Sequence, residues 1–257
     1  MEYMEYVEKK IRTGDKKGRL LRDPYTSNLS PILARIERLM EDKGSFSLIK
    51  HGSTTTVGLV KGEHFGIPFD IMVKRFNYKG MLHSIAKKIT GTRAKHLYRI
   101  NLKLFEKGLN VPRPIGFMEA MDMKKAFYIS EYEETAGNLA TLYVNGLFRE
   151  RNDIAPYLAK TLARWHLSGA VHGDLKWSNI LVAKDGAHLR FLFVDLDQTN
   201  LFRRPNIKGI NKDIQRFLRY GEKLSARKWL KEEFLPSYMS FMTSNIRERL
   251  EKSLRRF

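Results

Sequence analysis

Residues 170–182 read Ala-Val-His-Gly-Asp-Leu-Lys-Trp-Ser-Asn-Ile-Leu-Val, and this stretch decides the fold of the chain. It places Asp174, Lys176 and Asn179 on one short polar loop and continues directly into an apolar, β-prone run. Residues 191–197, Phe-Leu-Phe-Val-Asp-Leu-Asp, repeat the arrangement with carboxylates at the end of an apolar strand. The chain therefore carries two sets of polar side chains beside predicted strands.

Phosphoryl transfer requires such a set. A carboxylate must orient the substrate hydroxyl, and an amide and a second carboxylate must hold Mg²⁺ against the nucleotide phosphates. His172, Asp174 and Asn179 match the His-x-Asp-x-x-x-x-Asn catalytic loop of protein-kinase-like enzymes, and Asp195 falls where the metal-binding Asp of the Asp-Phe-Gly element stands. Asp and Asn are also ordinary turn residues, so each alone indicates a turn. His172, Asp174, Asn179 and Asp195 in this order predict an ATP-dependent enzyme with a kinase fold.

The composition of the whole chain narrows the class of protein. The 257 residues are 42% hydrophobic, enough for one bilobal enzyme or two small domains. No apolar run approaches the ~20 residues of a membrane-spanning helix, and the acidic-aromatic N-terminus lacks the apolar core of a signal peptide. The chain has no Cys, which excludes disulfides. We therefore expect a cytoplasmic protein.

The chain is strongly basic. Its 47 Lys and Arg residues against 28 Asp and Glu residues give a formal net charge of +19. Such a chain attracts nucleic acid, anionic lipid headgroups or a phosphorylated substrate, and charge alone does not choose among them. The aromatic residues have core-like spacing and do not alternate with basic residues as base-stacking platforms do. We therefore expect no specific nucleic-acid partner.

Residues 1–44 predict an N-terminal extension with one helix. The segment up to residue 28 is charged and weakly patterned. Ser30-Pro31 is typical of a helix start; an apolar stripe follows it, and Gly44 is the candidate stop. We expect this helix to pack on the small lobe that follows.

Residues 45–132 predict a nucleotide-binding N-lobe. A hairpin with small residues in its loop can place backbone N–H groups over phosphates. The candidate nucleotide-binding residues of this hairpin are Gly52, Ser53, Thr54, Thr55 and Val57. The loop is not Gly-x-Gly-x-x-Gly, so a Ser/Thr-rich turn is an equal alternative. Lys74 favours the nucleotide site, because it follows Ile-Met-Val as the kinase strand lysine follows Val-Ala-Ile. An exposed strand lysine is the alternative there.

The helix predicted to follow, ending at Gly108, lacks one expected residue. Kinases normally place a Glu on this helix to pair with the strand lysine. Here Glu106 lies at the helix end, and the middle carries Arg99 and Asn101. The partner of Lys74 is therefore open.

Residues 133–257 predict a mostly helical catalytic C-lobe. Glu131 and Glu133 flank the predicted hinge, where backbone N–H and C=O groups read the adenine edge; a solvated acidic turn is the alternative. Asp213 is interpreted as a helix start. A later apolar stripe over residues 235–254 packs on this lobe or lies on an anionic membrane surface. The basic residues beside that stripe are Arg247, Arg249, Lys252, Arg255 and Arg256.

Residues 172–181, together with Val-Asp-Leu-Asp at 194–197, resemble the lipopolysaccharide kinase family that phosphorylates Kdo or heptose of the inner core. Residues 91–94 (Gly-Thr-Arg-Ala) and 104–114 (Leu-Phe-Glu-Lys-Gly-Leu-Asn-Val-Pro-Arg-Pro) are similar to that family's Ser-Arg-Ala … Leu-x-x-x-Gly-x-x-x-Pro-x-Pro element. The likeness covers roughly residues 45–220. Gly-Asp-Leu also occurs in RIO-type protein kinases and in other phosphotransferases, so the loop does not specify the substrate.

The resemblance implies a bilobal α+β protein-kinase-like fold. A small antiparallel N-lobe with five strands and one main helix would stand over a mostly helical C-lobe, with ATP and Mg²⁺ (Mn²⁺ as an alternative) bound between them. Lys74 would contact the α- and β-phosphates, Asp174 would orient the acceptor hydroxyl, and Lys176 would steady the γ-phosphate. The implied catalytic set is His172, Asp174 and Lys176, and the implied metal set is Asn179, Asp195 and Asp197.

The resemblance also implies lipopolysaccharide core or another anionic sugar as the acceptor. The acceptor would be presented on the inner leaflet of a Gram-negative inner membrane, with peripheral contact to anionic lipid. One rival is a RIO-like serine/threonine protein kinase, and another is a different small-molecule phosphotransferase. A third is a non-catalytic pseudokinase, which predicts loss of the catalytic Asp, the metal Asn or the strand Lys. All three residues are present.

Overall fold

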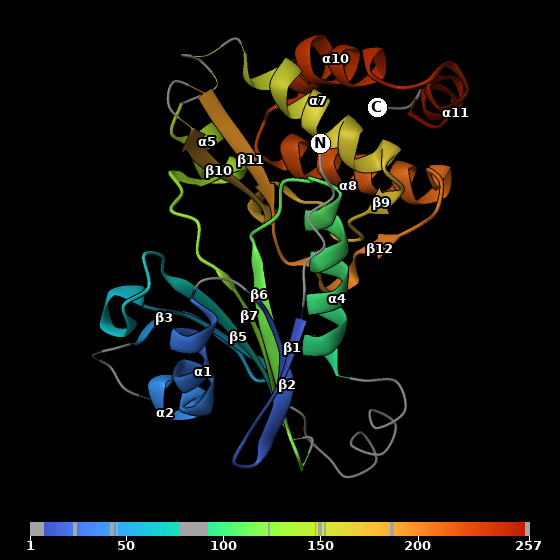
Figure 1. Ribbon diagram of the computed structural model, residues 1–257. Helices are drawn as coiled ribbons and strands as arrows, with labels where there is room; N and C mark the ends of the chain where they lie inside the picture. The colour runs from blue at the N-terminus through green and yellow to red at the C-terminus, as the bar shows by residue number, and fades with distance from the viewer. Residues whose placement is uncertain are drawn as a thin grey trace. The chain divides into compact units, whose positions relative to one another are not determined.

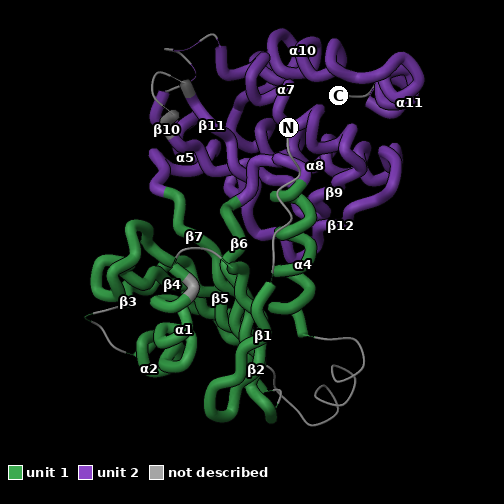
Figure 2. The backbone as a smooth tube through the Cα atoms, in the orientation of Figure 1, with its two compact units in different colours: residues 1–106, 112–133 green, residues 107–111, 134–257 purple. Residues whose placement is uncertain are grey.

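The computed structural model describes residues 8–22, 25–41, 44, 46–77, 92–122, 124–146, 148, 151, 153–185 and 188–254. The fold is α+β and divides into two compact units (Figures 1 and 2). Unit 1 consists of residues 1–106 and 112–133, and unit 2 consists of residues 107–111 and 134–257. The basic residues Arg255 and Arg256 of the predicted C-terminal stripe lie outside the described residues.

Unit 1 is built on an antiparallel sheet with the strand order β1-β2-β6-β7-β5-β4-β3. This sheet has seven strands, which corrects the five that the resemblance implies. The strands are β1 (Glu8–Thr13), β2 (Lys16–Leu21), β3 (Phe46–His51), β4 (Thr55–Val60), β5 (Ile71–Asn77), β6 (Pro114–Ala120) and β7 (Lys125–Glu131). A short turn of helix, η1 (Gly62–Phe65), joins β4 to β5.

The two additional strands come from the charged N-terminal segment. β1 and β2 pair across the turn Gly14-Asp15, where Gly14 has a φ of +52°. Glycine adopts such a conformation at little cost, and a Gly-Asp dipeptide is a hairpin signal. The buried Leu20 and Leu21 then attach β2 to the core. The turn dipeptide therefore indicates the hairpin better than the weak alternation of its strands.

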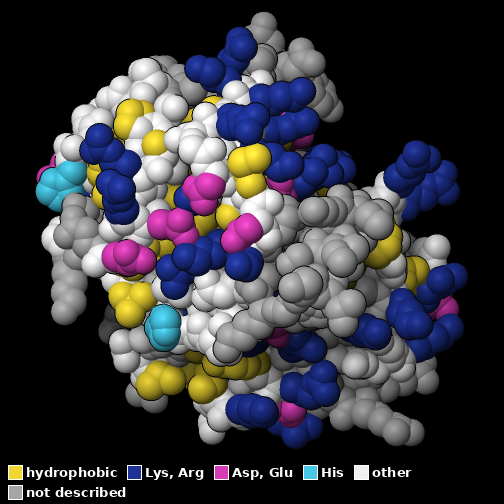
Figure 3. Space-filling view, turned by 90° about the horizontal axis from the view of Figure 1, so that it is seen from below, with side chains coloured by type: hydrophobic (Ala, Val, Ile, Leu, Met, Phe, Trp, Pro, Cys, Tyr) yellow, Lys and Arg dark blue, Asp and Glu magenta, His cyan; other side chains and the backbone are white. Residues whose placement is uncertain are grey.

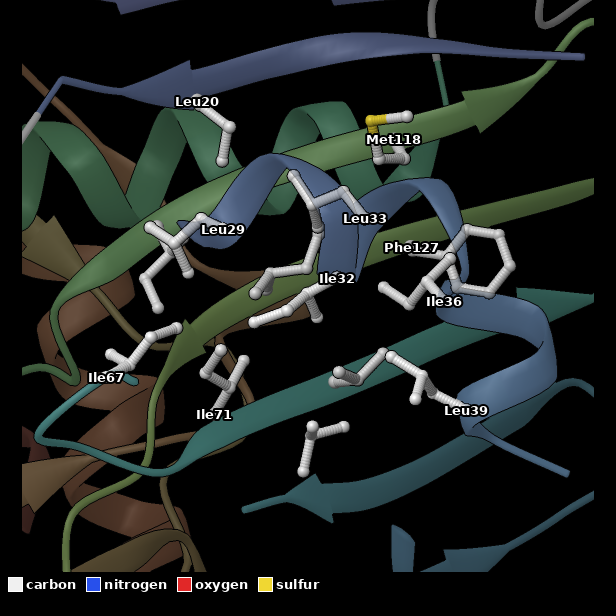
Figure 4. Packing of buried hydrophobic residues seen from close by; sticks show 14 residues of the cluster. Leu20, Leu29, Ile32, Leu33, Ile36, Leu39, Ile67, Ile71, Met118 and Phe127 are labelled. Carbon is white, nitrogen blue, oxygen red and sulfur yellow. The ribbon is translucent and has the colours of Figure 1, made fainter. Parts of the chain in front are cut away.

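Helices α1 (Thr26–Ala34) and α2 (Ile36–Leu39) cover one face of this sheet. Figure 4 shows Leu29, Ile32 and Leu33 of α1 packed with residues of the strands. The predicted start at Ser30-Pro31 is wrong, because α1 begins at Thr26 and encloses Pro31. The Asn28 side chain donates to the Phe65 carbonyl at 2.9 Å, a tertiary contact that supports the additional turn.

Helix α4 (Arg93–Glu106) packs on the opposite face of the sheet. The ring of Tyr98 lies 5.3 Å from the ring of Phe117 between centroids. The Asn101 side chain donates to the Pro112 carbonyl at 3.0 Å and to the Tyr128 hydroxyl. Asn101 is buried, so this polar residue in the middle of α4 joins the helix to β7 and to the segment before β6 and does not face solvent.

Unit 2 is mostly helical in its described part. Its helices are α5 (Leu139–Val144), α7 (Ile154–Leu167), α8 (Ile207–Lys223), α9 (Arg227–Trp229), α10 (Leu235–Ser240) and α11 (Ser244–Leu254), with the π-helical turn η4 (Leu230–Phe234). One small sheet has the order β11-β10-β8 and the other pairs β12 with β9. The strands are β8 (Gly137–Asn138), β9 (Ala170–Val171), β10 (Ile180–Asp185), β11 (His188–Phe193) and β12 (Asn200–Leu201).

The C-terminal stripe packs within unit 2. Ile246 and Leu250 of α11 are buried, and α11 contacts α8. The Ser253 hydroxyl also donates to the Asn211 side chain at 2.6 Å. The apolar face of α11 is therefore buried in the core of unit 2, and only its charged face is available for other contacts. Among the helices described, none combines the length and apolarity that crossing a bilayer requires.

Candidate active site

The predicted catalytic loop lies in unit 2 between β9 and β10. Its Gly173 has a φ of +79°, and a Cβ at that position would lie 2.6 Å from the Gln198 carbonyl oxygen. Only glycine fits there without displacing the neighbouring backbone. The β10–β11 hairpin pairs Ile180 with Phe193, and the Val194 N–H donates to the Asn179 carbonyl at 3.0 Å. This register brings Asn179 next to the segment that carries Asp195.

The loop brings two of the predicted residues, Lys176 and Asn179, to the carboxylate of a third, Asp174. Lys176 Nζ lies 3.1 Å from Asp174 Oδ2, and Asn179 Nδ2 donates to the same oxygen at 3.2 Å. Asn179 Nδ2 also donates to the Asp174 backbone carbonyl at 2.9 Å. The other oxygen, Asp174 Oδ1, lies 2.5 Å from Arg216 Nη1, a residue that the motif does not include. The roles of these side chains in catalysis stay predictions.

His172 supports the loop from inside the core. Its Nε2–H donates to the Val194 carbonyl at 3.0 Å, and its Nδ1 accepts the Asp174 backbone N–H at 3.3 Å. The second contact requires Nδ1 to be unprotonated, so the imidazole is neutral. Burial accordingly lowers the pKa of His172 below its ordinary value, although Asp213 and the Val194 carbonyl oppose the shift. His172 therefore holds the loop through these two hydrogen bonds, and a direct part in catalysis stays a prediction.

We expect this histidine to make the fold acid-sensitive. Because its folded pKa lies below 6.5, the unfolded chain takes up the proton first as pH falls. The contribution of His172 to the free energy of unfolding is complete above the unfolded pKa of 6.5. It is lost at up to about 1.4 kcal/mol per pH unit as the pH falls towards the folded pKa. Urea unfolding of wild type and His172→Gln between neutral pH and about pH 5 tests this. The free energy of unfolding is plotted against pH for both proteins, and the difference between the two slopes isolates the contribution of His172 from those of the other histidines. Equal slopes would contradict the assignment of acid sensitivity to His172.

A buried aspartate on α8 holds the backbone of the loop. Asp213 Oδ2 accepts the His172 N–H at 2.6 Å, and Asp213 Oδ1 accepts the Gly173 N–H at 2.9 Å. Behind it, His166 Nε2 lies 3.4 Å from Asp213 Oδ2, and His166 Nδ1 lies 2.6 Å from the Tyr238 hydroxyl. Burial raises the pKa of Asp213, but the bonds from His166 and the His172 N–H outweigh it, and the net shift is downwards. The carboxylate is therefore ionised, and both of its oxygens accept hydrogen bonds.

The interpretation of Asp213 as a helix start is wrong. α8 begins at Ile207, and its N-terminus is capped by Asn206, whose side chain accepts the Gly209 N–H at 3.0 Å. Asp213 lies within the helix and is 1% exposed. A usable signal existed in the sequence, since Asp213 falls inside the apolar stripe formed by Ile210 and Phe217. A carboxylate on a buried helix face needs hydrogen-bond partners, and the catalytic loop supplies them.

Asn179 and Asp195 suit Mg²⁺ by donor chemistry. Both hydrogen bonds from Asn179 Nδ2 go to Asp174. The amide oxygen Oδ1 therefore points away from Asp174 and is the atom that suits a metal ion. Asp195 is exposed, has a φ of +60° and precedes η3 (Leu196–Gln198), which contains Asp197. Among the described residues, no three His, Cys, Asp or Glu side chains cluster as a metal site. Mg²⁺ is usually held by one or two carboxylates plus nucleotide phosphates, so a smaller protein set is sufficient.

Unit 1 carries the predicted nucleotide-binding residues. Gly52, Ser53 and Thr54 form the loop between β3 and β4, closed by a bond from the Gly52 N–H to the Thr55 carbonyl at 2.8 Å. Val57 on β4 lies directly opposite Lys74 on β5, so the two share one face of the sheet. The Lys74 side chain runs over the Phe76 ring, with Nζ 5.4 Å from the centroid. Their contacts with a nucleotide stay predictions.

Two backbone N–H groups of the predicted hinge donate hydrogen bonds within unit 1. The Glu131 N–H donates to the Arg113 carbonyl at 2.9 Å, and the Tyr132 N–H donates to the Asp70 carbonyl at 2.8 Å. Neither N–H group can therefore read an adenine edge, which corrects that part of the prediction.

The described part of α4 has no carboxylate before Glu106, its last residue. Burial, with Glu8 nearby, raises the pKa of Glu106. The buried carboxylate near the other end of α4 is Glu119 of β6, which accepts the Thr92 hydroxyl at 2.6 Å. The sequence prediction that α4 lacks the usual pairing Glu in its middle therefore agrees with the helix observed.

Known proteins that are similar to this chain include one solved structure and two proteins compared by sequence. The solved structure "WaaP in complex with acyl carrier protein" matches with a TM-score of 0.56 at 14% identity, over 91% of this chain and 93% of that one. Serine/threonine-protein kinase ROP17 of Toxoplasma gondii is 36% identical over 77 residues, 30% of this chain and only 13% of that protein. KEOPS complex subunit Bud32 of Pyrococcus abyssi (strain GE5 / Orsay) is 24% identical over 198 residues, 75% of this chain and 84% of that protein.

The kinase-like fold and the match of a kinase family model together define a protein-kinase-like phosphotransferase. The model of the Lipopolysaccharide kinase (Kdo/WaaP) family matches residues 63–238, more than half of the chain. The chain belongs to this family. The family and the α+β kinase-like fold predicted from the sequence are thereby confirmed.

Proposed function

We propose that this protein transfers the γ-phosphate of ATP to a hydroxyl of the lipopolysaccharide inner core, on Kdo or heptose. The observation that carries the proposal is the contact set at Asp174, where Lys176 and Asn179 meet one carboxylate oxygen. Membership of the Lipopolysaccharide kinase (Kdo/WaaP) family supports a sugar as the acceptor.

In the proposed reaction, Asp174 orients the acceptor hydroxyl and takes its proton. The acceptor oxygen bonds to the γ-phosphorus, the bond from that phosphorus to the bridging oxygen breaks, and ADP leaves. Lys176 is 37% exposed on its side chain and its ammonium has three N–H donors, so it can meet the γ-phosphate while it keeps its contact with Asp174 Oδ2. Mg²⁺ would neutralise charge on the phosphates, held by Asn179 and Asp195, and Lys74 would contact the phosphates from β5.

We expect Asn179→Ala and Asp195→Ala each to raise the Mg²⁺ concentration needed for half-maximal activity. Each removes one of the few protein oxygens that hold the ion. A Mg²⁺ titration of turnover at saturating ATP measures the change. If Asp197→Ala raises the requirement and Asp195→Ala does not, Asp197 is the ligand and the motif is shifted by two residues. An unchanged requirement in all three variants would contradict the metal site.

Transfer of radiolabel from ATP tests the acceptor class. The purified protein is incubated with Mg²⁺, labelled ATP and either lipopolysaccharide core oligosaccharide or a mixture of proteins. The proposal expects label in the oligosaccharide and none in protein. Label in protein alone would instead support the serine/threonine kinase alternative, which the short match to ROP17 keeps as the second candidate.

The basic surface suits an anionic acceptor. Lys and Arg side chains are spread over the face shown in Figure 3, and the chain carries a formal charge of +19. Such a field raises the encounter rate with anionic ligands, including lipid headgroups. Because Ile246 and Leu250 of α11 are buried, we propose that any contact of α11 with the inner membrane is electrostatic and does not involve insertion of its apolar stripe.

A further inference from the structure

Arg216 makes a contact with the catalytic loop that lies outside the kinase-like motif. Its Nη1 lies 2.5 Å from Asp174 Oδ1. The motif residues Lys176 and Asn179 both contact the other oxygen, Oδ2. The two oxygens of Asp174 are therefore held from two sides, Oδ2 by the loop and Oδ1 by helix α8.

Helix α8 is a fixed platform for this arginine. Asp213, one turn before Arg216, accepts the backbone N–H groups of His172 and Gly173. One residue after Arg216, the Phe217 carbonyl accepts the Trp177 indole N–H at 3.1 Å. Since α8 is joined to the loop region on both sides of Arg216, the guanidinium is kept beside Asp174.

The lone pairs of the carboxylate locate the acceptor hydroxyl. An ionised carboxylate offers about four lone-pair positions, two on each oxygen. Lys176 and Asn179 occupy those of Oδ2, and Arg216 occupies one of those on Oδ1. An acceptor O–H that donates to Asp174 therefore approaches Oδ1. Its sugar ring then lies next to the guanidinium of Arg216.

Arg216 retains donors for a second anion. A guanidinium has five N–H groups. Among the described residues, Arg216 makes one ion pair, through Nη1. Its side chain is 42% exposed, so part of the guanidinium faces solvent. A planar group of this kind binds carboxylate or phosphate oxygens through two parallel hydrogen bonds, which the ammonium of lysine cannot do.

We propose that Arg216 binds a carboxylate or phosphate on the acceptor, close to the hydroxyl that is phosphorylated, while it positions Asp174. The role rests on the proposed sugar kinase function and makes Arg216 a determinant of acceptor specificity. An acceptor without the anionic group loses this contact but keeps Asp174.

The test compares three forms of one core oligosaccharide: native, carboxyl-reduced and enzymatically dephosphorylated. The proteins are wild type, Arg216→Gln, Arg216→Lys and the control Arg219→Gln. Arg219 lies on the same helix, is exposed and bonds the Gln215 carbonyl at 3.2 Å, so its replacement removes the same charge without touching Asp174. Acceptor binding is measured by calorimetry with a non-hydrolysable ATP analogue, and KM and kcat by phosphate transfer.

Arg216→Gln should weaken binding of the native acceptor by about 10–100-fold, the range of a charge-assisted contact. The same variant should change binding little for whichever modified acceptor lacks the recognised anion, and this identifies carboxylate or phosphate. Arg216→Lys should recover part of the affinity, and Arg219→Gln should behave as wild type. The kcat of Arg216→Gln should also fall on every acceptor, because Asp174 is less well held.

Equal losses of affinity on all three acceptors, or no loss on any, would overturn the specificity role and leave Arg216 as a support of Asp174 alone. Calorimetry separates this result from failure of the proposed function, because binding needs no turnover. If wild type binds the oligosaccharide without phosphorylating it, the sugar kinase function fails and the binding comparison still decides the role of Arg216. If wild type binds none of the three acceptors, both proposals fall.

Discussion

Replacing Asp174 with Asn should lower the rate of phosphoryl transfer by about 10²–10⁴-fold, the usual contribution of a positioned general base. Asn has nearly the same shape but cannot take the hydroxyl proton. Its NH₂ group must also face one of the donors that now meet the carboxylate, Lys176 and Asn179 on Oδ2 or Arg216 on Oδ1. ATP affinity should change little, because Asp174 is proposed to act on the acceptor.

Single-turnover transfer and nucleotide titration measure the two expected effects on the same preparation. Asp153→Asn is the matched control, because Asp153 is an exposed carboxylate of unit 2 that pairs with Arg151. Near-normal turnover of Asp174→Asn would remove this residue from the mechanism. Loss of ATP binding together with turnover would instead indicate that Asp174 holds the nucleotide site.

Replacing Asp213 with Ala should destabilise the fold and the active loop together. The variant leaves the buried His172 N–H and the partly buried Gly173 N–H without their acceptor. At about 1–3 kcal/mol for the buried group and less for the partly buried one, the free energy of unfolding should fall by roughly 2–4 kcal/mol. Displacement of the loop by about 1 Å should lower kcat by up to about 10²-fold in the molecules that stay folded.

Urea unfolding and kcat are compared for wild type, Asp213→Ala, Asp213→Asn and Lys212→Ala. Lys212 is exposed on the same helix and serves as the control. Asn retains one acceptor oxygen, so Asp213→Asn should lie between wild type and Asp213→Ala in both measurements. A loss of stability no greater than that of Lys212→Ala would show that the loop does not depend on this carboxylate.

The polar residues of the catalytic loop were predictable because the signal is local. His172, Asp174 and Asn179 are close in sequence, and the strands on either side of the loop are marked by their apolar residues. Lys74 was assigned to a strand in the same way, and β5 contains it, while its contact with a nucleotide stays a prediction. The family followed from these short stretches together with the Pro-x-Pro element.

Element boundaries failed where tertiary contacts compete with local preference. Pro31 is a good local start signal, yet α1 begins at Thr26, where the bond from Asn28 to Phe65 and the burial of Leu29 support the earlier turn. The N-terminal hairpin was missed because its strands are charged and weakly patterned, and it joins the sheet through the pairing of β2 with β6. Neither contact is visible in a short window of sequence.

The sequence by itself determined the class of this protein, its α+β fold and the residues of the His-x-Asp loop, because each depends on order and spacing along a short stretch. Only the tertiary structure showed that α8 supports this loop with two charged side chains. Asp213 holds its backbone and Arg216 holds its carboxylate, although both are about 40 residues away in the chain. Hydrogen bonds and ion pairs between residues so far apart in the chain leave no periodic pattern in the sequence. They depend on the position of α8, which is set by the packing of its apolar stripe.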